Sequence, residues 1–595
     1  MKMVKSLALS SAAALFAVGG AQAADLPVKA KAVEYVRICS LYGAGFFYIP
    51  GTDTCIKLGG YFRGDLTIHG GFSNQPFWNG DPGVQDRYVN QYNDYARVAL
   101  TVDTRTATEY GVVRTFSQLD MNYGTIGNTS SINVGSSIDP GSLGGQIVGS
   151  TQTGTLIPEY LLLQFAGFTF GKSASAYASP WHGFPGNNTA FLVGGYDTVT
   201  GINNVQYTAQ FGSGVSVTVG VDDSSAAGFN RTQIFNAALG GWNGIPGATP
   251  SFVVLASDLG VFSPVLPSVA SCNIGLYGAA SSLCTVEGTG YSGAFVPDFV
   301  ANVRVEQAWG LFQLSGALHD VSPAYWGTAN TANASTLVSG TNALGIETSG
   351  HPDSKLGFAV MAALQVKNLP TGPGDDIKLD GSVGEGALKY ILGTASTLPG
   401  SFYMTKANSL TTGGTIAIGA INDAVYGGWQ TPFQAGVQLT KGWGFRGAFN
   451  HNWDPFWSSS LFGGIAQISY NDTAKTLWCG SYGGTFANGT PMTGVGPFGL
   501  AYGAGHPATP GFGYTCDPGF TMAQIGLVTR WTPVKNLTFS AEGLYSYLKT
   551  NMTGFASGTT SSSFPIVGGT QAGISTWQYG NVGTASFNLR VQRNF

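Results

Sequence analysis

TASFNLRVQRNF, residues Thr584–Phe595, alternates between two kinds of side chain. Every second residue from Thr584 to Asn594 is polar, and all residues between them except Arg593 are apolar or aromatic. Successive side chains of a β-strand point to opposite faces, so the stretch predicts a strand with one polar and one apolar face. A soluble antiparallel sheet has such faces too. This strand, however, ends on an aromatic, and a barrel in lipid carries apolar residues outside, polar residues inside and aromatics at the interface.

The composition of the whole chain narrows the class of protein. Its 595 residues include 88 Gly and 36 Phe but only 10% charged residues, which is too apolar and aromatic for a disordered chain. The formal net charge is −4 and no basic stripe is present. We therefore expect no nucleic-acid partner.

The N-terminus has the three parts of a secretory signal. Lys2 and Lys5 form the positive end, Leu7–Val18 is the apolar stretch, and Ala21-Gln22-Ala23 is a small-residue cleavage site. After it, no apolar run of about 18 residues occurs, so no membrane-spanning helix is expected. Only helices and closed barrels satisfy their backbone groups in lipid, which leaves a barrel or a secreted protein. We divide the chain into a cleaved signal peptide (1–23), a lead-in with a disulfide loop (24–54) and a barrel (55–595).

The six cysteines of this exported chain indicate disulfides. Several connectivities are possible, and short loop closure favours neighbours in the sequence. No CxxC motif occurs, and no His stands at a metal-like spacing from a cysteine, so we expect loop staples, no metal site and no cofactor. The expected pairs are Cys39–Cys55, Cys272–Cys284 and Cys479–Cys516.

The two-residue alternation recurs along the chain. In Cys55–His69, Leu58 and Phe62 lie on one face and Arg63 and Asp65 on the other. Repeated alternating strands separated by turn residues are typical of a transmembrane barrel. Similar alternation occurs in Asp94–Asp103, Val215–Asp222, Phe312–His319, Lys355–Lys367 and Leu537–Ser546.

Short and long connections also alternate. Short turns are expected near Asp103–Ala107 and at Ala166-Gly167, whereas Ser224–Pro297 is one of several long stretches. Seventeen strand-like runs can be counted, but both termini on the periplasmic side require an even number. A separate strand at Pro432–Thr440 would invert every later connection, so we assign this run to a loop or to the start of one long strand. The prediction is an all-β, transmembrane antiparallel β-barrel of sixteen strands, a size that leaves an aqueous lumen.

Three segments resemble the alphaproteobacterial porin family, and the similarity covers nearly all of the mature chain. The resemblance implies a homotrimer in the bacterial outer membrane, surrounded by its lipids, with a loop folded into each pore. It also implies passive diffusion of small hydrophilic solutes and ions. The segments are VRICSLYGAGFFYIPGTDTCIKLGGYFRGD (Val36–Asp65), EYLLLQFAGFTFGKS (Glu159–Ser173) and WTPVKNLTFSAEGLYS (Trp531–Ser546).

By this resemblance, Lys172–Gly201 is the inward-folded constriction loop. Porins typically oppose acidic groups on that loop to basic groups on the wall. Here the loop contributes only Lys172, His182 and Asp197 as groups charged near neutral pH. We expect a constriction with more basic than acidic character and a modest anion bias, because charges act strongly across a narrow path.

Four arginines are the candidate wall groups of this constriction. Alternation points Arg63, Arg97 and Arg105 inward, whereas Arg114 shares a parity with two apolar neighbours and its direction stays open. The alternative is that these arginines form interstrand or loop pairs with little effect on ion selectivity.

Other functions fit the sequence less well. The GxGxxG match at Gly442–Gly447 runs into a strand with no following helix, and no nucleophile–base set can be assigned, so we expect no enzyme. The remaining alternatives are a substrate-selective outer-membrane channel for sugars or anions and a secreted all-β surface adhesin or lectin. The porin expectation is favoured because both the alternation and the resemblance support it.

Overall fold

The structure is a computed structural model of the chain, and it describes fourteen stretches of it. They are residues 37–70, 92–124, 153–181, 183–224, 231–236, 291–324, 350–393, 401–409, 413–427, 435–480, 500–501, 517–553, 555–558 and 576–595.

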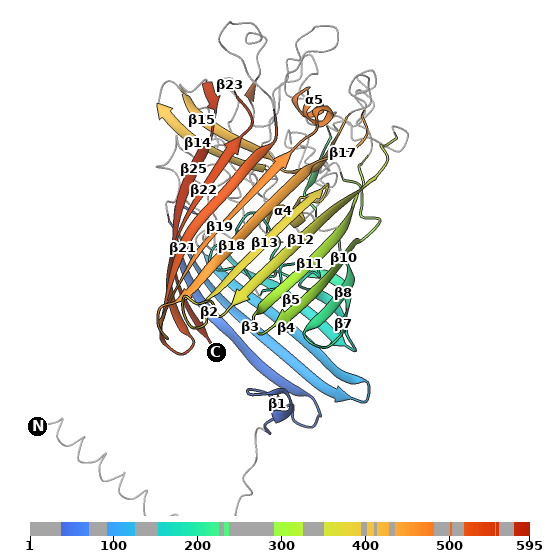
Figure 1. Ribbon diagram of the computed structural model, residues 1–595, viewed down its shortest axis with the longest axis vertical. Helices are drawn as coiled ribbons and strands as arrows, with labels where there is room; N and C mark the ends of the chain where they lie inside the picture. The colour runs from blue at the N-terminus through green and yellow to red at the C-terminus, as the bar shows by residue number, and fades with distance from the viewer. Residues whose placement is uncertain are drawn as a thin grey trace, which may run out of the picture.

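Sixteen strands in these stretches form a closed antiparallel barrel (Figure 1). The sheet that contains them has seventeen strands, but β1 (Phe47–Tyr48) only flanks β2 below the wall. Each wall strand pairs with the next, and β25 closes the barrel by pairing with β2, with Leu589 opposite Leu66. The wall consists of β2 (Cys55–Ile68), β3 (Tyr92–Thr108), β4 (Gly111–Gly124), β5 (Thr153–Phe165), β6 (Phe168–Ser173), β7 (Ile202–Gln210), β8 (Val215–Asp222), β10 (Asp298–Gln307), β11 (Gly310–Val321), β12 (Lys355–Lys367), β13 (Asp376–Glu385), β18 (Lys441–Asn452), β19 (Trp457–Ser469), β21 (Phe520–Val534), β22 (Leu537–Thr550) and β25 (Val582–Asn594).

This architecture confirms the predicted all-β barrel and its strand number. Of Pro432–Thr440, the described part carries only β17 (Gln438–Leu439), which pairs with β16 (Asn422–Tyr426) and not with the wall. The assignment of this run to a loop is therefore confirmed.

The remaining elements are short. None of the described helices combines the length and apolar character needed to cross a bilayer. The helices and strands outside the wall that have not yet been named are η1 (Ser40–Tyr42), β9 (Gln233–Asn236), α4 (Lys389–Leu392), β14 (Ser401–Ser409), β15 (Gly413–Ala420), α5 (Asp472–Gly480), β20 (Leu500–Ala501), β23 (Phe555–Gly558) and β24 (Thr576–Tyr579).

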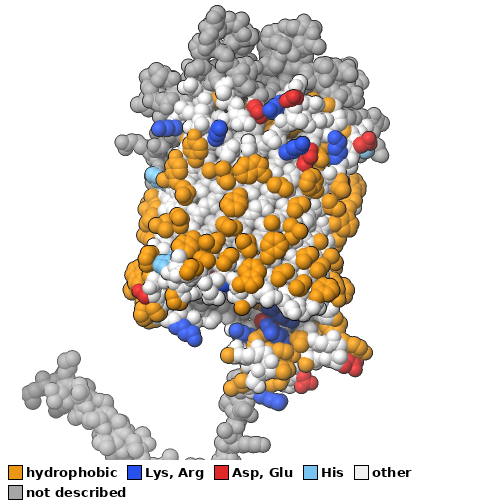
Figure 2. All heavy atoms as spheres, in the orientation of Figure 1, with side chains coloured by type: hydrophobic (Ala, Val, Ile, Leu, Met, Phe, Trp, Pro, Cys, Tyr) orange, Lys and Arg blue, Asp and Glu red, His pale blue; other side chains and the backbone are white. Residues whose placement is uncertain are grey.

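The terminal strand shows the predicted alternation. In β25, Phe587 and Leu589 are exposed on the outside, whereas Ser586 and Asn588 are buried on the inside. The face in Figure 2 repeats this arrangement over several strands, with charged side chains mostly above and below a belt of apolar ones. Such a belt matches the hydrocarbon layer of a membrane.

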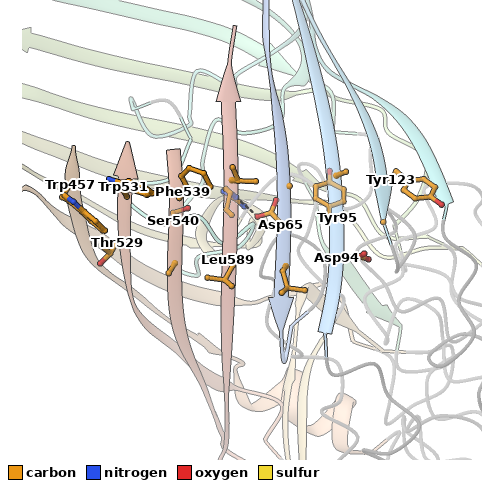
Figure 3. Close-up of a pocket in the computed structure, with 17 residues that line it drawn as sticks. Asp65, Asp94, Tyr95, Tyr123, Trp457, Thr529, Trp531, Phe539, Ser540 and Leu589 are labelled. Carbon is orange, nitrogen blue, oxygen red and sulfur yellow. Dashed lines mark hydrogen bonds and ion pairs between the residues drawn. The ribbon is translucent and has the colours of Figure 1, made fainter. Parts of the chain in front are cut away.

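The outer surface is hollowed where β2, β3, β22 and β25 meet. The hollow encloses about 700 Å³, and Gly64, Ala96 and Ala541 are among the residues that line it. On one side the rings of Trp457, Trp531 and Phe539 lie next to one another on neighbouring strands (Figure 3). Small residues beside large rings account for the depression.

One predicted turn is wrong. Asp103–Ala107 lies inside β3, and the β3–β4 ladder continues to Thr108 opposite Gly111, so the turn is at Glu109-Tyr110. Asp103 stays in the ladder because it bonds Arg105 and Arg114, an arrangement that the charged side chains alone did not indicate.

The first predicted disulfide closes the loop between Cys39 and the start of β2. Cys39 and Cys55 are bonded and buried, so this pairing is confirmed. The guanidinium of Arg105 lies over the rings of Tyr42 and Phe46 in the enclosed loop. The pairs Cys272–Cys284 and Cys479–Cys516 include positions outside the described residues, and they stay predictions.

Candidate functional site

A loop between β6 and β7 crosses the interior of the barrel. This inner loop, described at residues 174–181 and 183–201, contains Tyr177, Phe191 and Leu192, none of which is exposed to solvent. Its backbone bonds wall strands far away in the sequence: Val193 N donates to Gln524 Oε1 at 2.8 Å, and Gln313 Nε2 donates to Ala178 O at 2.8 Å. The predicted inward-folded loop is therefore confirmed.

Glycines allow the inner loop to lie against the far wall. Gly194 has a φ of +104°, which favours glycine, and its Cβ would lie 2.6 Å from Phe445 O. A Cβ on Gly195 would lie 1.9 Å from Asp380 Oδ1, and one on Gly464 of β19 would lie 2.1 Å from Val193 O. The loop backbone therefore lies against the backbone of β18 and β19 and against the Asp380 side chain of β13.

We expect the substitution Gly464→Ala to push the inner loop away from the wall. Its new methyl group would overlap Val193 O, and overpacking of this kind costs about 1–3 kcal/mol. The unit conductance in a planar bilayer should rise and the thermal stability in detergent should fall. Gly543→Ala is the matched control, because its Cβ meets nothing within 4 Å. Equal behaviour of the two variants would contradict this docking.

A second segment also enters the barrel, which the sequence analysis did not anticipate. This inner segment, as described at residues 386–393, 401–409, 413–427 and 435–440, lies between β13 and β18 in the sequence and includes α4 and β14–β17. Leu388, Ile391 and Phe402 are fully buried. They belong to one apolar core with the inner loop and with inward side chains of the wall such as Met361 and Phe520. Part of the lumen is thus filled by packed side chains.

The inner segment rests directly on the inner loop. Gly194 N donates to Leu392 O at 3.0 Å, and the rings of Tyr390 and Tyr177 lie 4.7 Å apart. The sequence contains a signal for this packing. β12 is apolar on both of its faces, with Val360 on the outer face and Met361 and Ala363 on the inner face, whereas a wall strand whose inner face meets water should be polar on that face.

A buried polar network ties the inner segment to the wall. Asp423 accepts hydrogen bonds from Leu388 N at 2.7 Å and from the Tyr291 hydroxyl at 2.9 Å. His319 of β11 bonds that hydroxyl at 2.8 Å and Asp298 at 2.7 Å. Burial lowers the pKa of the nearby Lys389 to about 7, although Asp197 and Asp423 oppose this shift.

Beside the inner loop lies a polar cavity of about 630 Å³. Loop residues 183–188, 190, 199 and 200 form one side of it, and inward side chains of the wall form the other. The loop residues at this cavity carry no carboxylate. Its charged lining residues are Arg63, Arg97, Lys378, Arg530, Arg590, Glu159 and Asp376, with His451.

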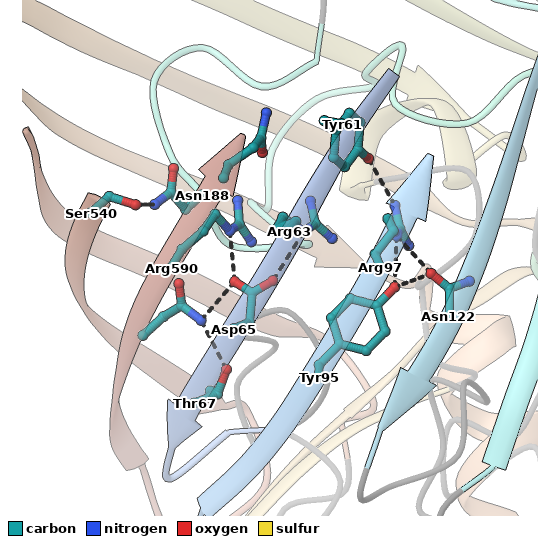
Figure 4. A network of polar contacts seen from close by, with 12 residues as sticks. Tyr61, Arg63, Asp65, Thr67, Tyr95, Arg97, Asn122, Asn188, Ser540 and Arg590 are labelled. Carbon is teal, nitrogen blue, oxygen red and sulfur yellow. Dashed lines mark hydrogen bonds and ion pairs between the residues drawn. The ribbon is translucent and has the colours of Figure 1, made fainter. Parts of the chain in front are cut away.

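Two of the predicted wall arginines line this cavity. Arg63 lies 3.0 Å from Asp65, and Arg97 lies 2.7 Å from Asp120. Figure 4 shows Arg97 also bonding Asn122, at 2.8 Å. Buried carboxylates that do not line the cavity thus partly neutralise the charge of these two arginines.

The other predicted charged residues lie elsewhere. Arg105 is on β3 and lies over the Phe46 ring of the disulfide loop, whereas Arg114 lines a second cavity, of about 620 Å³, on the other side of the inner loop. Lys172 donates to Pro158 O. Asp197 is almost fully buried, and burial raises the pKa of its carboxyl. His182 is outside the described residues.

Arg530 and Arg590 were missed as candidates at this cavity, although alternation indicates both. Arg590 belongs to the polar set of the terminal strand, and Arg530 has the opposite parity from the exposed Ile525 and Leu527. Their place at the cavity depends on the path of the inner loop, to which Arg530 donates at Gly186 O. In the part of the chain that is described, no three His, Cys, Asp or Glu residues group as metal ligands.

Comparison with known proteins adds sequence relatives. Residues 25–568 match the model of the porin subfamily. The chain is 34% identical over 247 residues to the porin Omp2b of Brucella suis biovar 1 (strain 1330), covering 40% of this chain and 59% of that porin. It is 35% identical over 227 residues to the porin Omp2b of Brucella abortus (strain 2308), covering 37% and 54%. The matches thus span little more than half the length of these relatives.

Among solved structures, the chain matches the outer membrane channel DcaP of Acinetobacter baumannii. The two share 12% identity with a TM-score of 0.45, over 92% of this chain and 99% of that one.

Proposed function

The chain belongs to the porin subfamily, and on that premise we propose that it forms a water-filled channel for passive diffusion of small hydrophilic solutes and ions. The observation that carries this proposal is the polar cavity between the inner loop and the wall, inside a barrel whose outer face is apolar. A polar interior within an apolar exterior gives hydrated solutes a path through hydrocarbon.

The protein is located in the bacterial outer membrane. We propose that it contacts the lipids there through its apolar belt and assembles as a homotrimer. The hollow lined by Gly64, Ala96 and Ala541 supports the second proposal, since small residues allow a neighbouring copy to approach closely.

Conductance of the purified, detergent-extracted protein in a planar bilayer tests the proposed channel. We expect stepwise current increases that scale with salt concentration, and a gel mobility that changes on heating. A detergent-free soluble protein that carries no current would contradict the proposal. Saturation by a single sugar would indicate a substrate-selective channel instead.

We propose further that the channel has a modest preference for anions. Arg63, Arg97 and three other basic groups line the cavity against only two carboxylates, although more carboxylates are buried behind them. We expect Arg63→Gln combined with Arg97→Gln to move the reversal potential in a salt gradient towards that of a cation-preferring channel. Arg63→Gln alone should act in the same direction and leaves the Arg97–Asp120 pair intact. Unchanged potentials would contradict the preference.

A further inference from the structure

The positive charges of the larger cavity are balanced unevenly. Arg97 has two carboxylates within reach, Asp120 at 2.7 Å and Glu159 at 3.8 Å. Lys378 lies 3.9 Å from Asp376. These two basic groups are therefore neutralised locally and leave little charge for a solute.

Three arginines on neighbouring strands share fewer carboxylates. Asp65 pairs with Arg63 at 3.0 Å and with Arg590 at 2.6 Å. Arg530 makes no ion pair within 4 Å among the residues that the structure describes, and it donates to Ser460 Oγ at 2.7 Å. The remaining carboxylate, Glu542, accepts hydrogen bonds from the inner-loop amide of Thr189 at 2.9 Å and from that of Asn188.

These groups therefore present a surplus of positive charge to the cavity. Three guanidinium groups face two carboxylates, and Asp65 and Glu542 are both buried while all three arginines line the cavity. The surplus lies on β21, β25 and β2, opposite the stretch of the inner loop that has no carboxylate.

The register places these arginines side by side. Arg530 pairs with Ser540, Ser540 with Arg590, and Arg590 with Asp65, so the four positions form one row across four strands. Arg63 is two residues from Asp65 on the same face of β2. Figure 4 shows Arg63 and Arg590 converging on the Asp65 carboxylate, with Ser540 beside them. The hydroxyl of Ser540, between these two long side chains in the row, accepts a hydrogen bond from Asn188 Nδ2 of the inner loop at 2.8 Å, so the loop borders the row.

Arg590 has an unused donor in this row. Its side chain is only 10% exposed, and its Nη2 is buried without a hydrogen-bond partner among the described residues. An unsatisfied buried donor of this kind costs free energy, which an oxygen of a negatively charged group would recover.

We infer that Arg63, Arg530 and Arg590 form a saturable subsite for the oxyanion group of a small solute, either a carboxylate or a phosphate. A guanidinium presents paired N–H groups whose spacing matches two oxygens of such a group. The inference rests on the proposed channel and adds to it the class of solute that binds transiently in the lumen. Chloride has no such pair of oxygens and passes without this match.

Chloride current through a planar bilayer tests the subsite. Inorganic phosphate and acetate are added separately at constant ionic strength. We expect at least one of them to reduce the current with saturation. Arg590→Gln should raise the half-blocking concentration about tenfold or more, because a hydrogen bond to a charged group is lost. Arg593→Gln is the matched control, because Arg593 lies on the same strand and is exposed. Phosphate and acetate should block this variant at the same concentration as the parent.

Each outcome separates the subsite from the channel itself. Block by phosphate alone assigns the subsite to phosphate groups, and block by acetate alone assigns it to carboxylates. A conducting protein without saturable block, or with equal block in Arg590→Gln and the parent, overturns the subsite and leaves the channel standing. A protein that folds but never conducts overturns the channel and the subsite with it. Arg530→Gln provides the same comparison if Arg590→Gln does not fold.

Discussion

Replacing residues 387–439 by a short Gly/Ser linker will raise the unit conductance several-fold. The described residues among them fill part of the lumen with fully buried side chains such as Leu388, Ile391 and Phe402. Their removal opens that cross-section to water and also frees the inner loop from Leu392 O and the Tyr390 ring. A short linker suffices because Glu385 of β13 pairs directly with Lys441 of β18. Planar-bilayer recording in salt solution measures the effect.

A pair of point variants controls for general damage to the barrel. Phe402→Ala removes a ring with no exposure inside the lumen, and we expect it to raise the conductance part of the way. Phe445→Ala removes a ring that is 46% exposed on the outer face and should leave the conductance unchanged. If the shortened protein folds, as shown by heat-modifiable mobility, and conducts like the parent, the inner segment does not occupy the conducting path.

Arg446→Met will lower the free energy of unfolding by roughly 3–5 kcal/mol, which is the usual cost of removing one partner of a buried ion pair. Arg446 Nε lies 2.9 Å from Asp380 Oδ2, and both side chains have 0% exposure. The substitution leaves the Asp380 carboxylate without its cation beneath Gly195 of the inner loop. Denaturation of the detergent-solubilised protein, followed by gel mobility, measures the change.

The second partner provides a rescue experiment for this ion pair. Adding Asp380→Asn to Arg446→Met removes the stranded charge, so most of the lost stability should return. Arg105→Met is the comparison, because its pair with Asp103 is 29% exposed at the arginine and exposed pairs contribute about 1 kcal/mol or less. Similar losses in the Arg446 and Arg105 variants would show that burial of the pair has no special effect.

The wall of the barrel could be predicted because the alternation of side chains depends only on neighbouring residues in the sequence. Alternation in Cys55–His69 and Thr584–Phe595 states which side chains face outward, and Leu66 and Leu589 meet there across the closing pair of strands. The assignment of Pro432–Thr440 to a loop needed only the parity of the connections. The turn predicted near Asp103–Ala107 lies further along the chain, at Glu109-Tyr110, because Asp103 is paired with arginines on both β3 and β4 and stays in the ladder.

The candidate site was predictable only in part. Alternation placed Arg63 and Arg97 on the inner face, and it also applied to Arg530 and Arg590, which were overlooked. The ion-pair partner of each arginine could not be predicted from neighbouring residues. Asp65 and its partner Arg590, for example, are 525 residues apart in the chain. Asp197 resembled a loop charge facing the lumen, yet it is almost fully buried, and Arg446 of β18 and Lys389 of the inner segment are its cationic neighbours.

The order of the residues alone determined a barrel in lipid, its strand number and the inner or outer face of most wall residues, because a two-residue period depends on nothing beyond neighbouring positions. Folding in three dimensions determined which inner faces meet water and which meet packed side chains. Met361 and Arg590 both point inward, but the inner segment covers the first and a polar cavity surrounds the second. Contacts between separate segments of the chain create that difference, and a two-residue period contains no information about them.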